Sequence, residues 1–405
     1  MSKNTLRIPR LGFWTVVGSL LVLVLGAITV VRFTRGLGAV TNLSDTFPWG
    51  LWIGFDVLCG VGLAAGGFAI TATVHILHLK DFKPIVRPTV LTAFLGYSLV
   101  VVALVFDLGK PWNIWHPLIM WNPHSVMFEV GWCVMLYSTV LMLEFVPAVL
   151  ERFKIHRPLK VLAKISPFLV ILGVILSTLH QSSLGSLYLI LKNKMSPLWY
   201  SPVLPILFFL SALAVGLAMT VIESWFSRRA LGKPIETELL SRLSRVSVVL
   251  LGLFLALRLR DLAARGALRD LWPLTGPSVL FFLEIVAGVV LPMVLLASSR
   301  FRRSPRRMAV AQGMVVLGFI LHRLNVAVTS VEVGTGQSYM PSVPEFLVSM
   351  GIVAFGMLLF CAACRYLPVF PEGAIADLEK KRKVPAFNGA ALDPEPAHGA
   401  GAVDR

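Results

Sequence analysis

The sequence has few charged residues and very little cysteine. Only 14% of its 405 residues are Asp, Glu, Lys or Arg, whereas an ordinary soluble domain has about 25%. Its four cysteines are too few for a disulfide-stapled secreted scaffold of this length. Because 56% of the residues are hydrophobic, a disordered chain and a coiled coil are also excluded.

The apolar residues occur in repeated blocks of about 20, which is the length of helix that crosses a bilayer core of about 30 Å. The sequence therefore predicts an all-α polytopic membrane protein. Ten spans can be drawn, near 11–31, 50–77, 86–106, 126–149, 162–180, 201–222, 243–259, 277–297, 308–331 and 344–367. The first has an apolar core too long for a secretion signal and no cleavage site after it, so residues 1–46 are expected to hold an uncleaved anchor helix.

The net charge of +16 is typical of a nucleic-acid binder, but the position of the cations argues against that class. They lie in short loops between apolar blocks, and no loop is long enough to form a DNA-reading module. Alternate loops carry 21 and nine lysines and arginines before the tail is counted. The positive-inside rule then places both termini in the cytoplasm. The tail 371–405, with KKRK at 380–383, is expected to be disordered, with KKRK near lipid headgroups.

Polar side chains recur at similar depth in the outer half of several spans. Trp49, Trp52 and Asp56 follow one another at helical spacing, and Glu129 lies one turn inside its span. The remaining members are His180, Gln181 and Ser182, and a supporting group of Arg258, Glu284, His322 and Arg323. Each has an ordinary explanation: the tryptophans as an interfacial belt, Arg258 as a snorkelling cation, and His180 as a helix-packing residue. Carboxyls inside apolar helices need a partner or a function, so Asp56 and Glu129 favour a functional site.

A quinone headgroup fits such a set of residues. It is planar and lipid-soluble, and it needs hydrogen bonds to two carbonyls and nearby proton donors when it is reduced. The hypothesis is therefore a quinone site formed by Trp49, Trp52, Asp56, Glu129, His180, Gln181 and Ser182.

A second polar series lies deeper. Glu144 follows Glu129 by 15 residues, which is about 22 Å along a helix, and the two occupy nearly one stripe. With His75 and Glu223 near the inner ends of their spans, these acids could extend a proton route. The alternative is that Glu144 and Glu223 sit at headgroup depth and pair with loop arginines.

Metal and haem chemistry are not expected in this chain. Cys361 and Cys364 form a CAAC motif, but no second pair accompanies it, so the thiols fit no iron–sulfur or zinc signature. A b-type haem needs two imidazoles at matching depth on facing helices. By depth, His180 and His322 are both outer and His75 and His78 both inner. The inner two are on one helix, three residues apart, and cannot ligate opposite faces of one porphyrin.

This combination resembles the NrfD/PsrC superfamily of quinone-interacting membrane subunits, and within it the HybB-type subunit of periplasmic NiFe hydrogenases. The resembling segments are FPWGLWIGFD (47–56), VRPTVLTAFLGYSL (86–99), NPHSVMFE (122–129), LEFVPAVLER (143–152), TLHQSSLGSLY (178–188) and SPLW (196–199). The second half matches more loosely, through the number of spans, Leu257-Arg258 and the stretch from Phe282 to Glu284.

The resemblance implies two four-helix bundles, 47–200 with the quinone site and 201–335, with 1–46 and the last helix in 336–370 peripheral. It implies no redox centre in the chain, a menaquinone substrate, and Asp56, Glu129, His180 and Gln181 at the quinone. Glu129 and Glu144 match family acids implicated in proton transfer. Electrons would come from a periplasmic four-cluster ferredoxin-like (HybA-type) subunit, fed by the large and small subunits of a NiFe hydrogenase in the bacterial inner membrane.

Other functions remain open. The catalytic partner could be a molybdopterin reductase or a multihaem complex. A secondary transporter would also suit ten spans with buried acids, although its broken helices usually lie at the midplane. A purely structural anchor is the third alternative.

Overall fold

The computed structural model describes residues 12–231 and 237–369. The expected tail 371–405 and the N-terminal cations Lys3, Arg7 and Arg10 lie outside this range. The elements in chain order are α1 (Phe13–Arg35), η1 (Leu37–Ala39), η2 (Trp52–Val57), α2 (Leu58–Leu63), α3 (Gly66–His75), η3 (Lys80–Phe82), α4 (Lys83–Asp107), η4 (Pro111–Asn113), η5 (His116–Leu118), α5 (Val126–Arg152), α6 (His156–Leu189), η6 (Lys192–Lys194), α7 (Leu204–Leu231), α8 (Thr237–Ala264), η7 (Ala267–Leu271), α9 (Gly276–Phe282), η8 (Leu283–Val290), α10 (Leu291–Ala297), α11 (Ser299–Arg302), α12 (Pro305–Leu324), η9 (Asn325–Thr329), α13 (Ser330–Thr335) and α14 (Val343–Tyr366).

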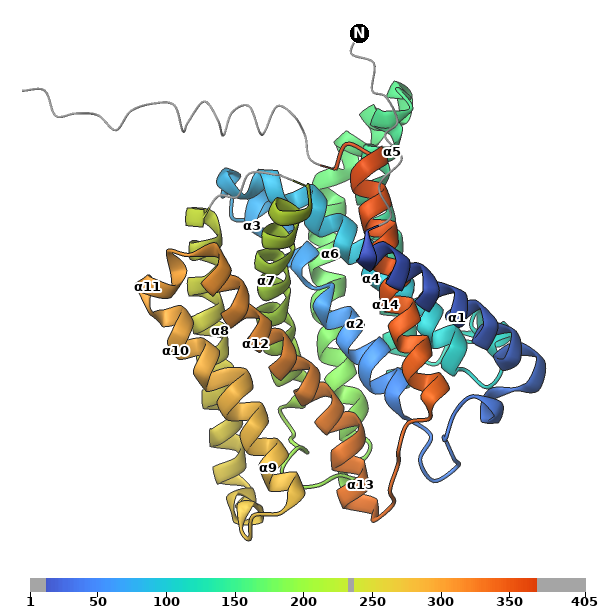
Figure 1. The fold of residues 1–405 in the computed structure, drawn as a ribbon, viewed down its shortest axis with the longest axis vertical. Helices are drawn as coiled ribbons and strands as arrows, with labels where there is room; N and C mark the ends of the chain where they lie inside the picture. The colour runs from blue at the N-terminus through green and yellow to red at the C-terminus, as the bar shows by residue number, and fades with distance from the viewer. Residues whose placement is uncertain (1–11, 232–236, 370–405) are drawn as a thin grey trace, which may run out of the picture.

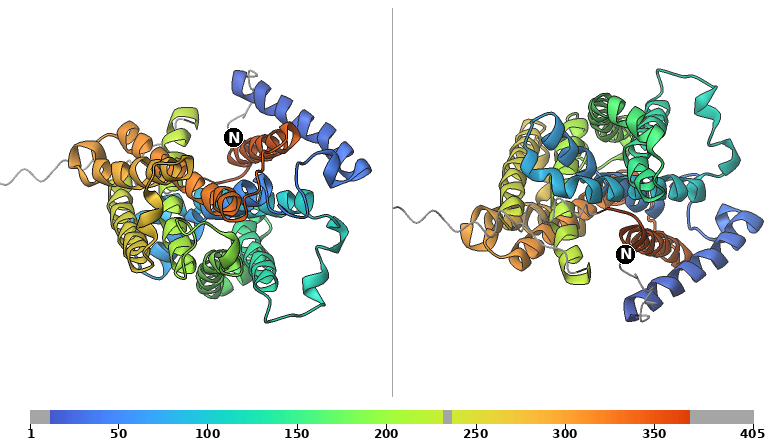
Figure 2. Two further views of the ribbon diagram at one scale, coloured as in Figure 1. Left: turned by 90° about the horizontal axis from the view of Figure 1, so that it is seen from below. Right: turned by 90° about the horizontal axis from the view of Figure 1, so that it is seen from above.

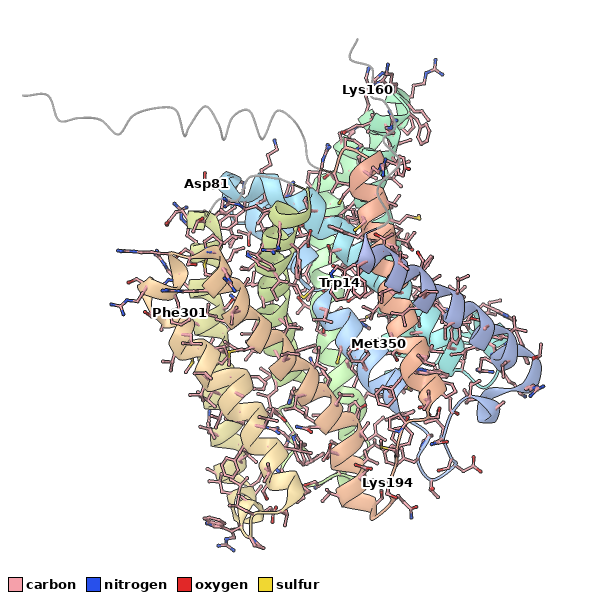
Figure 3. All side chains as sticks on the ribbon, viewed as in Figure 1. Trp14, Asp81, Lys160, Lys194, Phe301 and Met350 are labelled. Atoms are coloured by element: carbon pink, nitrogen blue, oxygen red, sulfur yellow. The ribbon has the colours of Figure 1, made fainter. Side chains whose placement is uncertain are left out.

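The helical fold class is confirmed. Ten helical segments of the described chain are long and apolar enough to cross a membrane, and this range contains no β-strand. They run between two ends of the molecule, one marked by Asp81, Lys160 and Phe301 and the other by Lys194 (Figure 3). We call these the Lys160 end and the Lys194 end. Several spans are longer than expected, and the largest differences are in the fifth, which covers His156–Leu189, and the seventh, which covers Thr237–Ala264.

The helices pack in a connected series (Figure 1). Helix α5 contacts α4 and α6, and α7 contacts α3, α6, α8 and α12, so the two halves of the chain meet along α7. Helices α1 and α14 lie side by side at one edge of the molecule (Figure 2). Large apolar side chains on α1, such as Phe13 and Trp14, are exposed, as expected for a surface that faces lipid. The division into two four-helix bundles remains a prediction.

Close helix contacts depend on glycine. A Cβ built on Gly216 of α7 would lie 2.5 Å from the backbone nitrogen of Gly66 at the start of α3. Only a missing side chain allows the two backbones to approach so closely, which is a common device in membrane helix packing.

The second span is interrupted in its middle. Helix α2 ends at Leu63, and α3 begins at Gly66 after a turn at Ala64 and Ala65. The turn is buried, and its amides remain hydrogen-bonded. The Ala64 N–H donates to the Gly60 carbonyl oxygen (3.1 Å), and the Ala65 N–H donates to the Gly62 carbonyl oxygen (3.0 Å). The break is therefore packed against α7 and does not line an open path.

Three spans contain a π-helical stretch, and each stretch holds a buried polar residue. Asp56 lies in η2, Glu284 in η8 and Asn325 in η9. A π turn inserts one extra residue into the helix and re-aims the side chains that follow, and such turns often occur at functional sites.

The loop before α14 is fixed by Tyr339. Its hydroxyl donates a hydrogen bond to Glu345 and accepts one from the Leu51 N–H (2.9 Å). Glu345 also accepts the backbone N–H of Ser342, which completes the capping box of α14. Burial raises the pKa of Tyr339, and the bond to Glu345 raises this pKa further. The hydroxyl therefore stays a donor at ordinary pH.

Candidate functional site

Glu129 lies in the first turn of α5, toward the Lys194 end, where Ser125 caps the helix. Its side chain is exposed, so within the described chain it faces outward. The Ser183 hydroxyl of α6 lies 2.5 Å from Glu129 Oε1 and 2.8 Å from the Leu179 carbonyl oxygen. A hydroxyl has one hydrogen, so Ser183 can donate to only one of these oxygens at a time.

His180 and Gln181 precede Ser183 on α6 and are completely buried. The Gln181 amide donates to the Val61 carbonyl of α2 (3.0 Å), and the His180 ring packs against the Tyr97 ring of α4 at 5.6 Å between centroids. Both ring nitrogens of His180 and Oε1 of Gln181 have no hydrogen-bond partner among the described residues. His180 and Gln181 thus have unused hydrogen-bonding capacity on the helix that contacts Glu129 through Ser183, and we call Glu129, His180 and Gln181 the group around Glu129.

The other predicted quinone-site residues have different neighbours. The Trp49 ring contacts Tyr188 at 5.9 Å, and Tyr188 is on α6, the helix of His180 and Gln181, about two turns further along. The Ser182 hydroxyl donates back to Leu179 (2.9 Å) and Thr178 (3.1 Å) of its own helix. Ser183, and not Ser182, makes the contact with Glu129.

Asp56 and Trp52 face the last helix. Asp56 accepts a hydrogen bond from Ser349 of α14 (2.6 Å), and the Trp52 indole N–H donates to the Glu345 carbonyl (3.1 Å). Span two therefore presents Val61 toward α6 and Asp56 toward α14. Glu129 and Asp56 therefore have different neighbours, Ser183 of α6 and Ser349 of α14.

The three residues predicted to extend a proton route, Glu144, Glu223 and His75, also have different neighbours. Glu144 of α5 is half-buried, and its Oε1 lies 4.0 Å from a Cβ built on Gly173 of α6. Glu223 of α7 accepts a hydrogen bond from Thr92 of α4 (2.8 Å). His75 is exposed at the end of α3 and contacts the Thr71 carbonyl of its own helix (3.1 Å). Glu144 alone shares a helix pair with Glu129.

Glu284 is the centre of a buried network in the second half of the chain. Its Oε2 accepts from Trp199 (2.9 Å) and Asn325 (2.7 Å), and its Oε1 contacts His322 Nδ1 at 2.8 Å. Arg258 and Arg323 lie close enough to Glu284 to interact electrostatically. The predicted supporting group is thus a compact cluster in which one carboxylate faces two guanidinium groups.

The two arginines also contact backbone and rings, although Nε and Nη1 of each have no hydrogen-bond partner among the described residues. Arg258 donates to the Leu198 carbonyl (2.8 Å), and Arg323 donates to the Phe208 carbonyl (3.1 Å). The Arg323 guanidinium also lies 3.4 Å from the centroid of the Phe208 ring, a cation–π contact. Both are fully buried, and neither snorkels toward a membrane surface.

Several polar residues at these sites were not singled out from the sequence. They are Tyr97, Tyr137, Ser177, Trp199, Asn325 and Ser349. One signal was available, because Tyr137 follows Glu129 by eight residues and so shares its face of α5. The others depend on which helices pack together. In the described residues no three His, Cys, Asp or Glu side chains gather as metal ligands.

The fold and these groups define an integral membrane protein whose polar interior is built from side chains of several spans. Comparison with known proteins is consistent with this class. Residues 39–333 match the family described as "Polysulphide reductase, NrfD", and the chain belongs to this family.

Three relatives align over most of their length. A protein of Nitratidesulfovibrio vulgaris strain Hildenborough is 38% identical, over 87% of this chain and 93% of its own. The "probable Ni/Fe-hydrogenase 2 b-type cytochrome subunit" of Escherichia coli K12 is 34% identical, over 87% and 91%. The "menaquinone reductase, integral membrane subunit" of N. vulgaris is 30% identical, over 84% and 87%.

Proposed function

We propose that this chain is the quinone-reactive membrane subunit of an oxidoreductase complex. It would pass electrons from a periplasmic iron–sulfur subunit of HybA type to menaquinone, with uptake of two protons for each menaquinol formed. The names of the E. coli and N. vulgaris relatives support a hydrogenase or menaquinone reductase complex, and the likeness to the E. coli subunit favours a hydrogen-uptake NiFe hydrogenase. The inner membrane and cytoplasmic termini are part of the proposal.

The observation that carries the proposal is the group around Glu129. A lipid-soluble headgroup reaches a membrane protein from the bilayer, and Glu129 is an exposed carboxyl in the outer turn of α5. On the neighbouring helix α6, His180 and Gln181 have unpartnered polar atoms and are fully buried. A quinone carbonyl needs such a donor, and quinone reduction needs an acid within reach of the bilayer.

Each residue has a definite task in this arrangement. His180 or Gln181 would hold a carbonyl oxygen of the headgroup, and Glu129 would deliver a proton to the oxygen as it gains negative charge. Trp49, next to Tyr188, would form an aromatic wall. Asp56 is proposed to act from the α14 side of span two, where it is held by Ser349.

A haem is not part of the proposal, although one relative is named a b-type cytochrome subunit. Of the histidines in the described range, only His180 and His322 are buried. His322 contacts Glu284 and lies between the Phe208 and Phe254 rings, whereas His180 packs on Tyr97. The two imidazoles thus have different neighbours, which supports leaving haem out of the proposal.

Binding of a fluorescent quinone analogue, heptyl-hydroxyquinoline N-oxide, tests the proposal on the purified complex. Glu129→Gln and His180→Ala are expected to weaken binding about fivefold or more, the effect of losing roughly 1 kcal/mol of hydrogen bonding. Glu151→Gln is the matched control, because Glu151 lies at the other end of α5 and pairs with Arg87. Parental affinity in both site variants would rule out this quinone site.

A further inference from the structure

The connection between α4 and α5, residues 108–125, carries large apolar side chains on its surface. Four of them are 61–71% exposed: Trp112, Ile119, Met120 and Trp121. Between Lys110 and Glu129 the sequence contains no Asp, Glu, Lys or Arg. In both views of Figure 2 this connection, drawn in turquoise, swings out sideways from the helices. An exposed apolar patch of this kind marks a surface that contacts lipid or another protein.

The connection folds back along the outside of α5. The Trp132 indole N–H of α5 donates to the Pro117 carbonyl oxygen (2.8 Å). A Cβ built on Gly131 would lie 3.8 Å from Cγ of Pro117, and the Trp121 ring packs against the Trp132 ring at 4.9 Å between centroids. Pro117 and Trp121 therefore lie beside the second turn of α5.

These contacts give the depth of the connection relative to the bilayer. The candidate membrane span of α5 begins at Val126, and Gly131 lies five residues, or about 8 Å, further along the helix. Pro117 is therefore below the start of the span, whereas a water-soluble partner would dock above it. Apolar segments that lie in the plane of the membrane interface are buried to a similar depth of about 5–10 Å.

The backbone is partly paired within the connection, as contact with lipid requires. The N–H groups of Ile119 and Met120 both donate to the His116 carbonyl oxygen (3.0 and 2.8 Å). The Trp121 indole N–H donates to the Leu118 carbonyl oxygen (3.0 Å). An indole ring with a bonded N–H suits the membrane interface, because its apolar body can face lipid while its polar edge keeps a partner.

We propose that residues 111–121, which we call the interfacial segment, lie in the lipid at the Lys194 end of the membrane, at the boundary between headgroups and acyl chains. Trp112, Ile119 and Trp121 contact the lipid. The depth beside Gly131 and the lack of charged residues favour lipid over a water-soluble partner. The inference does not depend on the quinone chemistry.

The interfacial segment borders the exposed acid of α5. The Trp121 ring lies 6.0 Å from the ring of Phe128, the residue before Glu129. Consecutive residues of a helix are about 100° apart, so the face of α5 that the segment covers adjoins the face that carries Glu129. On its other side Glu129 contacts Ser183 of α6. Lipid that contacts the interfacial segment therefore also reaches this carboxyl.

An environment-sensitive fluorophore on the interfacial segment tests the proposal in the whole complex, reconstituted in lipid nanodiscs. Ile119→Cys is labelled with an NBD iodoacetamide in a background that carries Cys361→Ser and Cys364→Ser. The remaining cysteines, Cys59 and Cys133, are buried and give little labelling. Emission is then quenched either by lipids with a doxyl group near the top of the acyl chain or by iodide in the water.

Gln337→Cys, labelled in the same background, is the matched control. Gln337 is an exposed loop residue at the same end of the molecule, three residues after Gly334, whose Cβ would meet the Lys194 backbone. The Ile119 probe should be quenched about twofold or more strongly than the Gln337 probe by doxyl lipid, because its depth is that of the acyl-chain boundary. Iodide should quench the two probes in the opposite order.

Two results would overturn the proposal. Quenching of the Ile119 probe by iodide as strongly as the Gln337 probe, without quenching by doxyl lipid, would show that the segment lies in water. Protection of the Ile119 probe from both quenchers would show that a partner subunit covers it.

A direct observation covers the case in which the labelled variants do not fold. In a cryo-electron microscopy map of the unmodified complex in nanodiscs, Trp112 and Ile119 should lie within the density of the lipid disc. A segment that stands clear of the disc, or that packs against another subunit, would contradict the assignment. Neither measurement involves quinone, so the quinone site is tested separately by the binding of heptyl-hydroxyquinoline N-oxide.

Discussion

Glu284 is a single buried acid that compensates the charge of buried arginines. It is 1% exposed and accepts three hydrogen bonds, and it is the acid that balances Arg258 and Arg323, both 0% exposed. A buried pair of this kind adds little net stability when it is complete. Removing one member is different, because the remaining charges stay buried without compensation.

Glu284→Gln should therefore destabilise the protein strongly. The amide keeps the size of the side chain but removes the negative charge and turns one acceptor into a donor that faces another donor. The expected cost is about 3–5 kcal/mol, seen as a large fall in the melting temperature in detergent. Asp81→Asn is the control, since Asp81 and Arg242 form an exposed pair worth about 1 kcal/mol or less. Equal melting temperatures for the two variants would contradict this account.

At the scale of helices, the sequence predicted where spans lie better than where they end. The fifth was expected to end at 180 because His180, Gln181, Ser182 and Ser183 are polar. In the structure α6 continues to Leu189, since these groups face α2, α4 and α5 and not water. Polar side chains mark the end of a span only where they face solvent. The sequence alone does not show which helix will cover them.

Side-chain direction along span two was predicted in part. Helical spacing placed Trp49, Trp52 and Asp56 on one face, and Trp52 and Asp56 do share a neighbour in α14. Trp49 instead contacts Tyr188, because it precedes the helical segment. The π-helical stretch η2 further changes the phase of the residues after it, so Val61 faces α6. A regular period of 3.6 residues cannot anticipate an inserted π turn.

The close contact between α3 and α7 predicts that a side chain added at Gly216 destabilises the protein. Gly216→Ala places a methyl group 2.5 Å from the Gly66 nitrogen, where the neighbour is backbone and cannot rotate away. The two helices must separate, at a cost of about 1–3 kcal/mol for overpacking. Gly26→Ala on α1 is the matched control, because its Cβ would meet no atom within 4 Å. Scanning fluorimetry and gel filtration should show a loss of stability in the first variant alone, and an unchanged Gly216→Ala would disprove the close contact.

Across the whole molecule, ten spans could be predicted because bilayer thickness fixes the length of an apolar helix. The candidate site was predicted less completely. Residue types predicted that Glu129 and His180 belong to one site, which stays a prediction; the structure shows Glu129 in contact with Ser183, three residues after His180 on α6. Nothing in the sequence showed that Asp56 would face α14 or that Tyr97 and Tyr137 would meet, because those contacts depend on how spans far apart in the chain pack.

The distribution of cations between the two ends predicts the orientation of the whole molecule. The loops at the Lys160 end belong to the cation-rich set, and those at the Lys194 end to the poorer set (Figure 3). Positively charged loops are retained in the cytoplasm. Lys194→Cys should therefore react with a membrane-impermeant maleimide added to intact spheroplasts, whereas Lys160→Cys should react only after the membrane is opened.

The parent protein, which contains Cys59, Cys133, Cys361 and Cys364, gives the background for this labelling. The experiment also bears on the chemistry, because Glu129 lies toward the Lys194 end of α5. Labelling of Lys194→Cys from outside would put Glu129 in the periplasmic half of the membrane, within reach of a periplasmic electron donor. Labelling of Lys160→Cys alone would invert the molecule and move the proposed quinone site to the cytoplasmic half, where a periplasmic iron–sulfur subunit could not reduce it.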